Sequence, residues 1–149
     1  MKTMKEIIRK NIHTPYSLHD MNVIGFEILD NDLVMTFQSG MCRISDPVEQ
    51  VDGYVKFLNL DWDFCFVTLI REIVNEGPIT GEKMTFLDFI KRYEEFSFSI
   101  IDEVFGYNKT KFWGWLSAGE SLQECIIELY HLGDMVYVDM EPASCDFTS

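Results

Sequence analysis

Hydrophobic and polar residues alternate with a period of two along much of this chain, which is the pattern of strands that bury one face. The first clear example lies between residues 23 and 38, where two alternating segments flank a short polar turn. Asn31 and Asp32 suit the two central positions of a hairpin turn. In that register Ile28 faces Met35, so the pattern predicts a β-hairpin with one apolar face.

Alternation continues through the middle of the chain, interrupted by clusters of Gly, Pro, Asn and Asp that predict turns. The segment 75–81 is one such cluster and predicts a loop. Further strands are expected at residues 54–60, 62–74, 96–105, 111–117 and 123–130. The first two of these could also form one long bent strand.

One internal segment has the 3.6-residue period of a helix instead. Thr85 and Asp88 have the spacing of an N-cap and its capping-box partner, which predicts where this helix begins. Its apolar stripe consists of Phe86, Phe89, Ile90 and Tyr93. We expect this helix to cover one face of the sheet.

The N-terminal segment, residues 1–12, also has helical spacing. Met4, Ile7, Ile8 and Ile12 fall on one side of a helical wheel and the basic residues fall largely elsewhere. The segment therefore predicts a short amphipathic helix or an arm, and packing on the domain is favoured over membrane binding.

The end of the chain predicts a second hairpin. Gly133-Asp134 is a Gly-first pair that suits a type II′ turn between two strand patterns. In this register Tyr130 opposes Tyr137, and Glu128 opposes Asp139. The core side of the hairpin would collect Ile127, Leu129, Val136, Val138 and Met140.

About seven or more strand patterns and one firm internal helix indicate an α+β domain: a mainly antiparallel, curved sheet with the helix packed on it. A length of 149 residues is usual for one domain, so residues 1–149 are expected to fold as a single unit. Residues 142–149 lack periodicity and are expected to form a loose tail.

Charge adds the chemistry of the surface. The formal net charge is −13; the first 12 residues contribute +3, so the remaining 137 carry −16. Such a field repels phosphate backbones and attracts basic proteins, so we expect a basic protein partner and no nucleic acid. No stretch resembles a signal peptide or a membrane span, which predicts a cytoplasmic protein with no membrane partner.

Familiar catalytic motifs are missing from the sequence, including Gly-x-Ser-x-Gly and both common glycine-rich phosphate loops. We therefore assign no catalytic residue and no cofactor. Neither the four cysteines nor the three histidines have the spacing of metal ligands, so no metal site is predicted. Cys65 and Cys125 lie in apolar runs and are expected to be buried as free thiols.

The outer face of the predicted final hairpin is the main candidate binding surface. It gathers Glu124, Glu128, Tyr130, Tyr137 and Asp139. Opposed like charges destabilise a sheet by up to about 1 kcal/mol, so a lysine, a metal or a basic partner should offset Glu128 and Asp139. A solvated acidic surface is the simpler interpretation, and a binding surface for a basic protein is the alternative.

Aromatic residues suggest a second kind of site. Trp113 and Trp115 flank Gly114 and project from the same side of a predicted strand. With Trp62 they could line an aromatic pocket for a small ligand, or they could pack in the core beneath the internal helix. An enzyme would instead require acids and a histidine to converge, for example Asp102, Glu103 and His19. Adjacent strand residues such as Asp102 and Glu103 point to opposite faces, which disfavours that function.

Three short motifs carry a family resemblance: LHD at residues 18–20, IDEVFGYN at 101–108 and YHLGDMVY at 130–137. Together they resemble small uncharacterised bacterial proteins, some of which look like immunity proteins of polymorphic toxin systems. The resemblance implies a non-catalytic interaction module that binds a basic toxin. A small-ligand-binding domain and an enzyme of unfamiliar type remain the alternatives.

Overall fold

The computed structural model describes residues 4–10, 13–45, 47–72 and 79–141. Within these ranges the chain forms thirteen β-strands, one α-helix and one short 3-10 helix, η1. The strands of the first part are β1 (Lys5–Ile8), β2 (Tyr16–Ser17), β3 (Asn22–Leu29), β4 (Asp32–Phe37), β5 (Met41–Arg43), β6 (Glu49–Val51) and β7 (Gly53–Phe57). The later elements are η1 (Trp62–Phe64), β8 (Phe66–Glu72), β9 (Ile79–Thr85), α1 (Phe86–Arg92), β10 (Ser97–Gly106), β11 (Lys109–Ala118), β12 (Ser121–Tyr130) and β13 (Met135–Asp139).

Ten of the strands form one antiparallel sheet in the order β1-β13-β7-β4-β3-β10-β11-β12-β8-β9. A second antiparallel sheet has three short strands in the order β2-β5-β6. The mainly antiparallel architecture with one internal helix is confirmed. The strand count exceeds the predicted minimum of seven because β1, β2, β5, β6 and β9 were not predicted as strands. Strand β9 includes residues 79–81 of the predicted loop, and residues 75–78 of that loop lie outside the described part of the chain.

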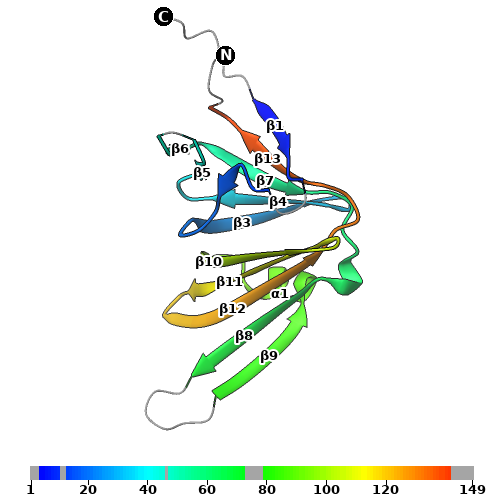
Figure 1. Cartoon of the computed structure of the whole chain (residues 1–149). Helices are drawn as coiled ribbons and strands as arrows, with labels where there is room; N and C mark the ends of the chain where they lie inside the picture. The colour runs from blue at the N-terminus through cyan, green and yellow to red at the C-terminus, as the bar shows by residue number, and fades with distance from the viewer. Residues whose placement is uncertain (1–3, 11–12, 46, 73–78, 142–149) are drawn as a thin grey trace, which may run out of the picture.

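The large sheet consists of two halves that meet at β3 and β10 (Figure 1). Their register there comprises Phe98 opposite Val23 and Ser99 opposite Asn22. The inner faces of the two halves pack together, with the ring centroid of Phe57 on β7 lying 6.1 Å from that of Phe112 on β11. Buried apolar side chains of both halves form one cluster. One sheet therefore supplies both sides of its own core.

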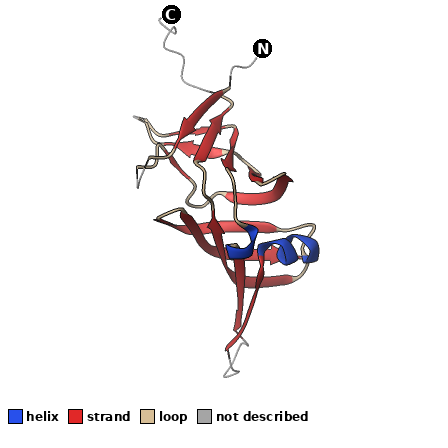
Figure 2. Ribbon diagram, turned by 90° about the vertical axis from the view of Figure 1, so that its right-hand side faces the viewer, coloured by secondary structure: helices blue, strands red, loops and turns tan. Residues whose placement is uncertain are grey.

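Helix α1 begins where the capping pattern predicts. The Thr85 side chain accepts a hydrogen bond of 3.1 Å from the backbone N–H of Asp88. Phe86 and Phe89 are fully buried, and the ring of Phe86 packs edge-on against Phe26 of β3 at 5.0 Å. The helix thus joins the core cluster, to which the two halves of the sheet both contribute. Figure 2 shows the helix, in blue, beside the half of the sheet that contains β8 and β9.

The first hairpin is confirmed, but its turn lies one residue earlier than predicted. Leu29 pairs with Asp32, so Asp30 and Asn31 form the turn and Ile28 faces Leu33. Asp30 adopts the left-handed conformation, with φ 57°, which its short polar side chain tolerates. The Asp32 carboxylate accepts a hydrogen bond from the backbone N–H of Asn59, a contact outside the hairpin that keeps Asp32 in the strand.

The predicted N-terminal helix is wrong: Lys5–Ile8 form strand β1, which pairs with β13. A helix of three turns is marginal by itself in water. The edge of β13 instead offers a row of backbone donors and acceptors, and pairing with it satisfies the N-terminal backbone. Residues 1–3 and 11–12 lie outside the described part of the chain.

The predicted final hairpin is also wrong. Strand β12 pairs with β11 and β8 in one half of the sheet, and β13 pairs with β7 and β1 in the other half. The segment 131–134 crosses between the halves, with His131 bridged to Leu60 and the N–H of Gly133 bonded to the Leu58 carbonyl. All five residues of β13 are buried, which is typical of a strand covered on both faces.

The two cysteines predicted to be buried, Cys65 and Cys125, are both fully inaccessible free thiols. Burial raises the pKa of Cys65 to about 11 and that of Cys125 to about 12, so neither is a nucleophile at neutral pH. Their role is packing. The predicted loose tail, residues 142–149, lies outside the described residues.

Candidate functional site

The predicted acidic and aromatic surface is divided between the two halves of the sheet. Glu124, Glu128 and Tyr130 lie on the outer side of β12, whereas Tyr137 and Asp139 are buried on β13. Because β12 and β13 do not pair, the predicted opposition of Glu128 and Asp139 does not occur. The five residues therefore do not form one surface.

Partners already offset the acids on β12. The Oε1 atom of Glu128 lies 3.8 Å from Nζ of Lys111 and 4.0 Å from Nζ of Lys109. Glu124 accepts a hydrogen bond of 2.6 Å from the indole N–H of Trp113. The sheet surface around them is a mixed polar surface, because these carboxylates have neighbours on β11.

Asp139 belongs to a buried polar network that joins the large sheet to the small one. Its Oδ2 atom accepts hydrogen bonds from the Tyr16 hydroxyl at 2.5 Å and from Arg43 Nη2 at 2.8 Å. Burial, followed by the hydrogen bond to Asp139, raises the pKa of Tyr16 well above its usual value. The hydroxyl therefore stays protonated and donates. The ring of Tyr137 packs beside Tyr16 at 5.2 Å, so both Tyr137 and Asp139 act in structure.

The three tryptophans do not share a pocket. Trp113 is half-buried and Trp115 is 42% exposed, and both alternate with the fully buried Phe112 and Leu116. The indoles therefore lie on the outer side of β11. Trp62 instead stacks on the buried ring of Phe86 at 6.2 Å, so it belongs to the edge of the core.

The acids considered for an enzyme diverge. Asp102 is exposed, whereas Glu103 is mostly buried and accepts a hydrogen bond of 3.3 Å from the backbone N–H of Leu18. Burial is the main cause that raises the pKa of Glu103 to about 7. His19 pairs with its neighbour Asp20, its Nδ1 lying 3.1 Å from the Asp20 carboxylate. A catalytic set would need these groups to point into one cleft, and Asp102 and Glu103 do not.

A different acidic feature, which sequence reasoning missed, lies at the right-hand end of the molecule in Figure 1. Three connecting segments meet there: the β3–β4 turn, the β7–β8 connection and the crossover between β12 and β13. Backbone hydrogen bonds join them, from Leu60 N–H to the Asn31 carbonyl at 2.7 Å and from Leu132 N–H to the Asn59 carbonyl at 2.8 Å. These loops are therefore held as one assembly rather than as separate mobile turns.

These segments carry five aspartates, which we call the aspartate end: Asp30, Asp32, Asp61, Asp63 and Asp134. Residues 30–32, 58–64 and 131–134 contain no lysine or arginine. The ion pairs found among the described residues all involve other carboxylates. A cationic group brought near these carboxylates would be attracted to them.

A hollow lined by both apolar and polar side chains opens beside two of these aspartates, Asp61 and Asp63. Its volume is about 290 Å³, and it is lined by Asn31, Leu60, Asp61, Trp62, Asp63 and Leu132. Leu132 is 53% exposed and Phe64 of the same loop is 57% exposed. Exposed apolar side chains beside carboxylates are the arrangement found in protein interfaces, which have an apolar centre and a polar rim.

Within the described residues, no group of three or more His, Cys, Asp or Glu side chains is arranged to hold a metal ion. In the same part of the chain, no helix has the length and apolar character needed to cross a bilayer. Comparison with known proteins adds no assignment: the chain matches no protein-family model, no curated protein and no solved structure.

One sequence signal could have revealed the aspartate end. Residues 135–139 form a continuous apolar run ending in Asp139, and such runs are typical of strands buried on both faces rather than of a half-exposed hairpin. That pattern argues for a central strand, and hence for a crossover at residues 131–134. The sequence pattern does not show which other loops lie beside this crossover, because their contacts join segments far apart in the chain.

Proposed function

We propose that this protein is a non-catalytic interaction module that binds a basic protein through the aspartate end. The observation that carries the proposal is a hollow lined by Asp61 and Asp63 together with Leu60, Trp62 and Leu132, in loops that carry three further aspartates and no lysine or arginine. The proposed partner is a basic toxin, because the sequence motifs resemble immunity proteins. This surface replaces the hairpin surface that the sequence suggested.

Electrostatics supports a basic partner in particular. The whole chain carries a net charge of −13, and a field of that sign speeds the approach of a cationic protein and orients it. Among the described residues, no lysine or arginine forms an ion pair with the five aspartates of the aspartate end, so the basic side chains of a partner would not have to displace one.

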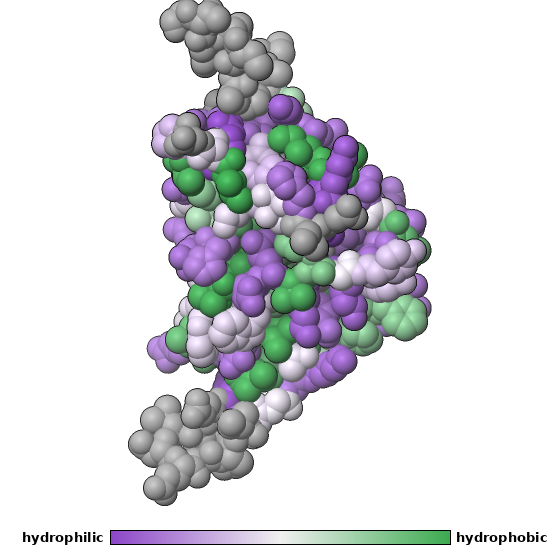
Figure 3. Space-filling model, in the orientation of Figure 1, coloured by the Kyte–Doolittle hydropathy of each residue, from purple (hydrophilic) through white to green (hydrophobic). Residues whose placement is uncertain are grey.

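Apolar contacts would supply most of the binding affinity of the proposed interface. Exposed ion pairs contribute only about 0 to 1 kcal/mol each, so affinity needs buried apolar side chains at the centre of the interface. Leu132, Trp62 and Phe64 offer such contacts beside the aspartates. At the right-hand edge of Figure 3, hydrophilic and hydrophobic residues indeed lie side by side. The proposed partner therefore presents basic residues around an apolar side chain.

Binding to the basic proteins encoded beside this chain's gene tests the proposal. Each neighbour would be purified, in an inactivated form if toxic, and titrated by calorimetry at about 0.05 M and about 0.3 M salt, where the screening length falls by more than half. We expect one neighbour to bind, with an affinity that falls at least about tenfold at the higher salt.

Variants then locate the interface. The triple variant Asp61→Asn, Asp63→Asn, Asp134→Asn should weaken that complex at least about tenfold. A matched control removes the same three charges from exposed positions outside the three segments: Glu94→Gln, Glu95→Gln and Glu120→Gln. If no basic neighbour binds, the proposed function is wrong. If both triple variants weaken the complex equally, only the overall field matters and the aspartate end is not the binding surface.

A further inference from the structure

The two faces of the half-sheet formed by β10, β11, β12, β8 and β9 differ in what covers them. On the inner face Phe112, Leu116 and Cys125 are fully buried, in the same core cluster as Phe86 and Phe89 of α1. The outer face carries the alternate residues of the same strands, and these remain partly or fully exposed. We call this outer side the open face.

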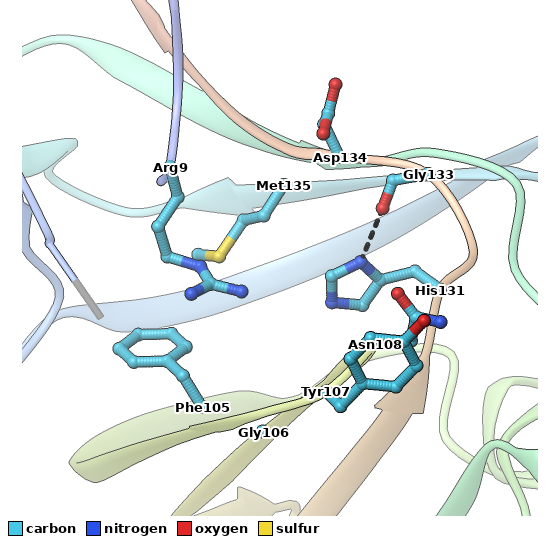
Figure 4. A pocket seen from close by; sticks show the side chains of 9 residues that line it. All are labelled: Arg9, Phe105, Gly106, Tyr107, Asn108, His131, Gly133, Asp134 and Met135. Atoms are coloured by element: carbon cyan, nitrogen blue, oxygen red, sulfur yellow. Dashed lines mark hydrogen bonds between the residues drawn. The ribbon is translucent and has the colours of Figure 1, made fainter. Parts of the chain in front are cut away.

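The inner face is also covered near the β10–β11 turn (Figure 4). The guanidinium carbon of Arg9, just after β1, lies 4.3 Å from the centre of the Phe105 ring on β10. Beside it, Nδ1 of His131 lies 2.9 Å from the Gly133 carbonyl in the crossover segment. In the described part of the chain, the open face is therefore the side of this half-sheet that a partner could reach.

The centre of the open face is rich in apolar side chains. Trp113 of β11 opposes Ile126 of β12. In the next row of the sheet Trp115 opposes Glu124, which in turn opposes Ile70 of β8. Two indoles and two isoleucines therefore lie in adjacent rows across three neighbouring strands.

Three large apolar side chains of this face are strongly exposed. Trp115 is 42% exposed, Val104 of β10 is 53% exposed, and Leu122 of β12 is 65% exposed. Exposed apolar side chains that gather on one face mark interaction surfaces, and tryptophan is enriched among the residues that dominate binding energy. The open face therefore has the composition of an interface centre.

Charge indicates which partner fits. The described charged side chains of the open face are three lysines and three acids, so their charges cancel: Lys83, Lys109, Lys111, Asp102, Glu124 and Glu128. The whole chain, by contrast, has a net charge of −13. Two copies of such a chain repel each other over most of their surfaces, and they meet the least repulsion where each presents a neutral face.

The size of the open face is also suitable. Its five strands have at least seven residues each. With strands about 4.8 Å apart and residues about 3.4 Å apart, the face measures about 600 Å² before the relief of the side chains is counted. A standard interface buries roughly 800 Å² per partner, which is of the same order.

We infer that the open face is the interface of a homodimer, in which a second copy of this chain docks face to face. In a twofold dimer the same residues come from both copies, so Trp115 of each would lie at the apolar centre and the balanced charges would surround it. This inference goes beyond the proposed function, because none of the residues that line the hollow at the aspartate end belongs to the open face.

Sedimentation equilibrium of the full chain measures the dimer directly. As the protein concentration rises from about 1 µM to about 300 µM, the apparent mass should increase from that of one chain toward that of two. One chain has a mass of 17.4 kDa.

Variants locate the interface. Trp115→Ser should raise the dissociation constant of the dimer at least about tenfold. Ile8→Ser is the matched control, because Ile8 is 46% exposed on β1 at the opposite edge of the sheet, and it should leave the dissociation constant unchanged. Leu122→Lys adds a like charge to each copy at a strongly exposed position and should also weaken the dimer. If Trp115→Ser does not fold by circular dichroism, Leu122→Lys decides.

Three results would overturn the inference. The first is a chain that remains a monomer up to about 300 µM. The second is a dimer that both open-face variants leave intact, and the third is a dimer that Ile8→Ser weakens as much as they do. Because this experiment contains the chain alone, its failure would leave the proposed binding of a basic protein intact, and the reverse also holds.

Discussion

Arg43 and Asp139 form a buried ion pair in which Nη2 and Oδ2 lie 2.8 Å apart, although the two residues are 96 positions apart in the sequence. Arg43 lies on the small sheet and Asp139 on β13 of the large sheet. Their side chains are 12% and 1% exposed. This pair therefore connects the two sheets at a place where neither charge can turn to water.

Replacing Asp139 should destabilise the protein strongly. Asp139→Asn removes the buried counter-charge of Arg43 and leaves only the exposed carboxylate of Glu49, so we expect a loss of about 3 kcal/mol. The matched control is Glu49→Gln, because Glu49 is the exposed partner of the same arginine, at 3.1 Å and 53% exposed. We expect less than about 1 kcal/mol for that variant. Urea unfolding followed by circular dichroism measures both, and equal losses would contradict the buried pair.

Glu103 should make the stability of the protein fall as the pH rises. Its pKa is about 7 in the folded protein and 4.5 ordinarily. Between these values the unfolded chain releases the proton and the folded chain keeps it, so the free energy of unfolding decreases from about pH 4.5 to about pH 7. The decrease is on the order of 3 kcal/mol.

The variant Glu103→Gln should abolish most of that pH dependence and raise stability at pH 8 relative to the parent. Asp102→Asn, at the exposed neighbouring position, is the control and should keep the dependence. Chemical unfolding at pH 5 and pH 8 provides the measurement. A Glu103→Gln variant with the parent's pH profile would show that Glu103 is ionised freely in the folded state.

Gly114 should not tolerate a side chain. A Cβ atom there would lie 1.8 Å from the Ser99 carbonyl oxygen on β10, and the backbone would have to move. We expect Gly114→Ala to cost about 3 kcal/mol or more, or to prevent folding. Gly81→Ala provides the comparison on β9, since its nearest atom would be 3.9 Å away. Gly81→Ala should leave the free energy of unfolding unchanged or raise it by up to about 1 kcal/mol. Thermal unfolding measures both variants.

The cap of helix α1 should contribute a modest, separable part of the stability. Thr85→Ala removes the acceptor for the Asp88 N–H and should cost about 1 kcal/mol. Thr85→Ser keeps the hydroxyl and should recover most of that loss. If alanine and serine behave alike in thermal unfolding, the hydroxyl does not contribute through the cap.

Local patterns predicted the elements whose signals lie within a few residues. The capping pair Thr85 and Asp88 located α1, because a helix terminus needs an acceptor beside its own backbone donors. Alternation located β10, β11 and β12 to within about two residues at each end. The first hairpin was predicted with a shifted turn, because the bond between Asp32 and Asn59 comes from a distant segment.

Predictions that depended on a neighbour chosen from elsewhere in the chain were wrong. Gly133 and Asp134 have the residue types of a tight turn, yet the hydrogen-bond partners of this segment lie at residues 58–60. The five residues of the predicted hairpin surface therefore lie in two different halves of the sheet, and Asp139 forms a buried ion pair with Arg43. The aspartate end arises in part from this crossover.

The sequence by itself determined most of the longer strands, where α1 begins, and that the chain is acidic, because these follow from local propensity, periodicity and composition. Only the tertiary structure decided which strands are neighbours and which acids meet. A strand edge offers similar donors and acceptors to any partner, so backbone pairing alone does not select one. The partners of β13 were selected by the burial of both of its faces in a shared core. The free energy of that burial depends on side chains from many parts of the chain.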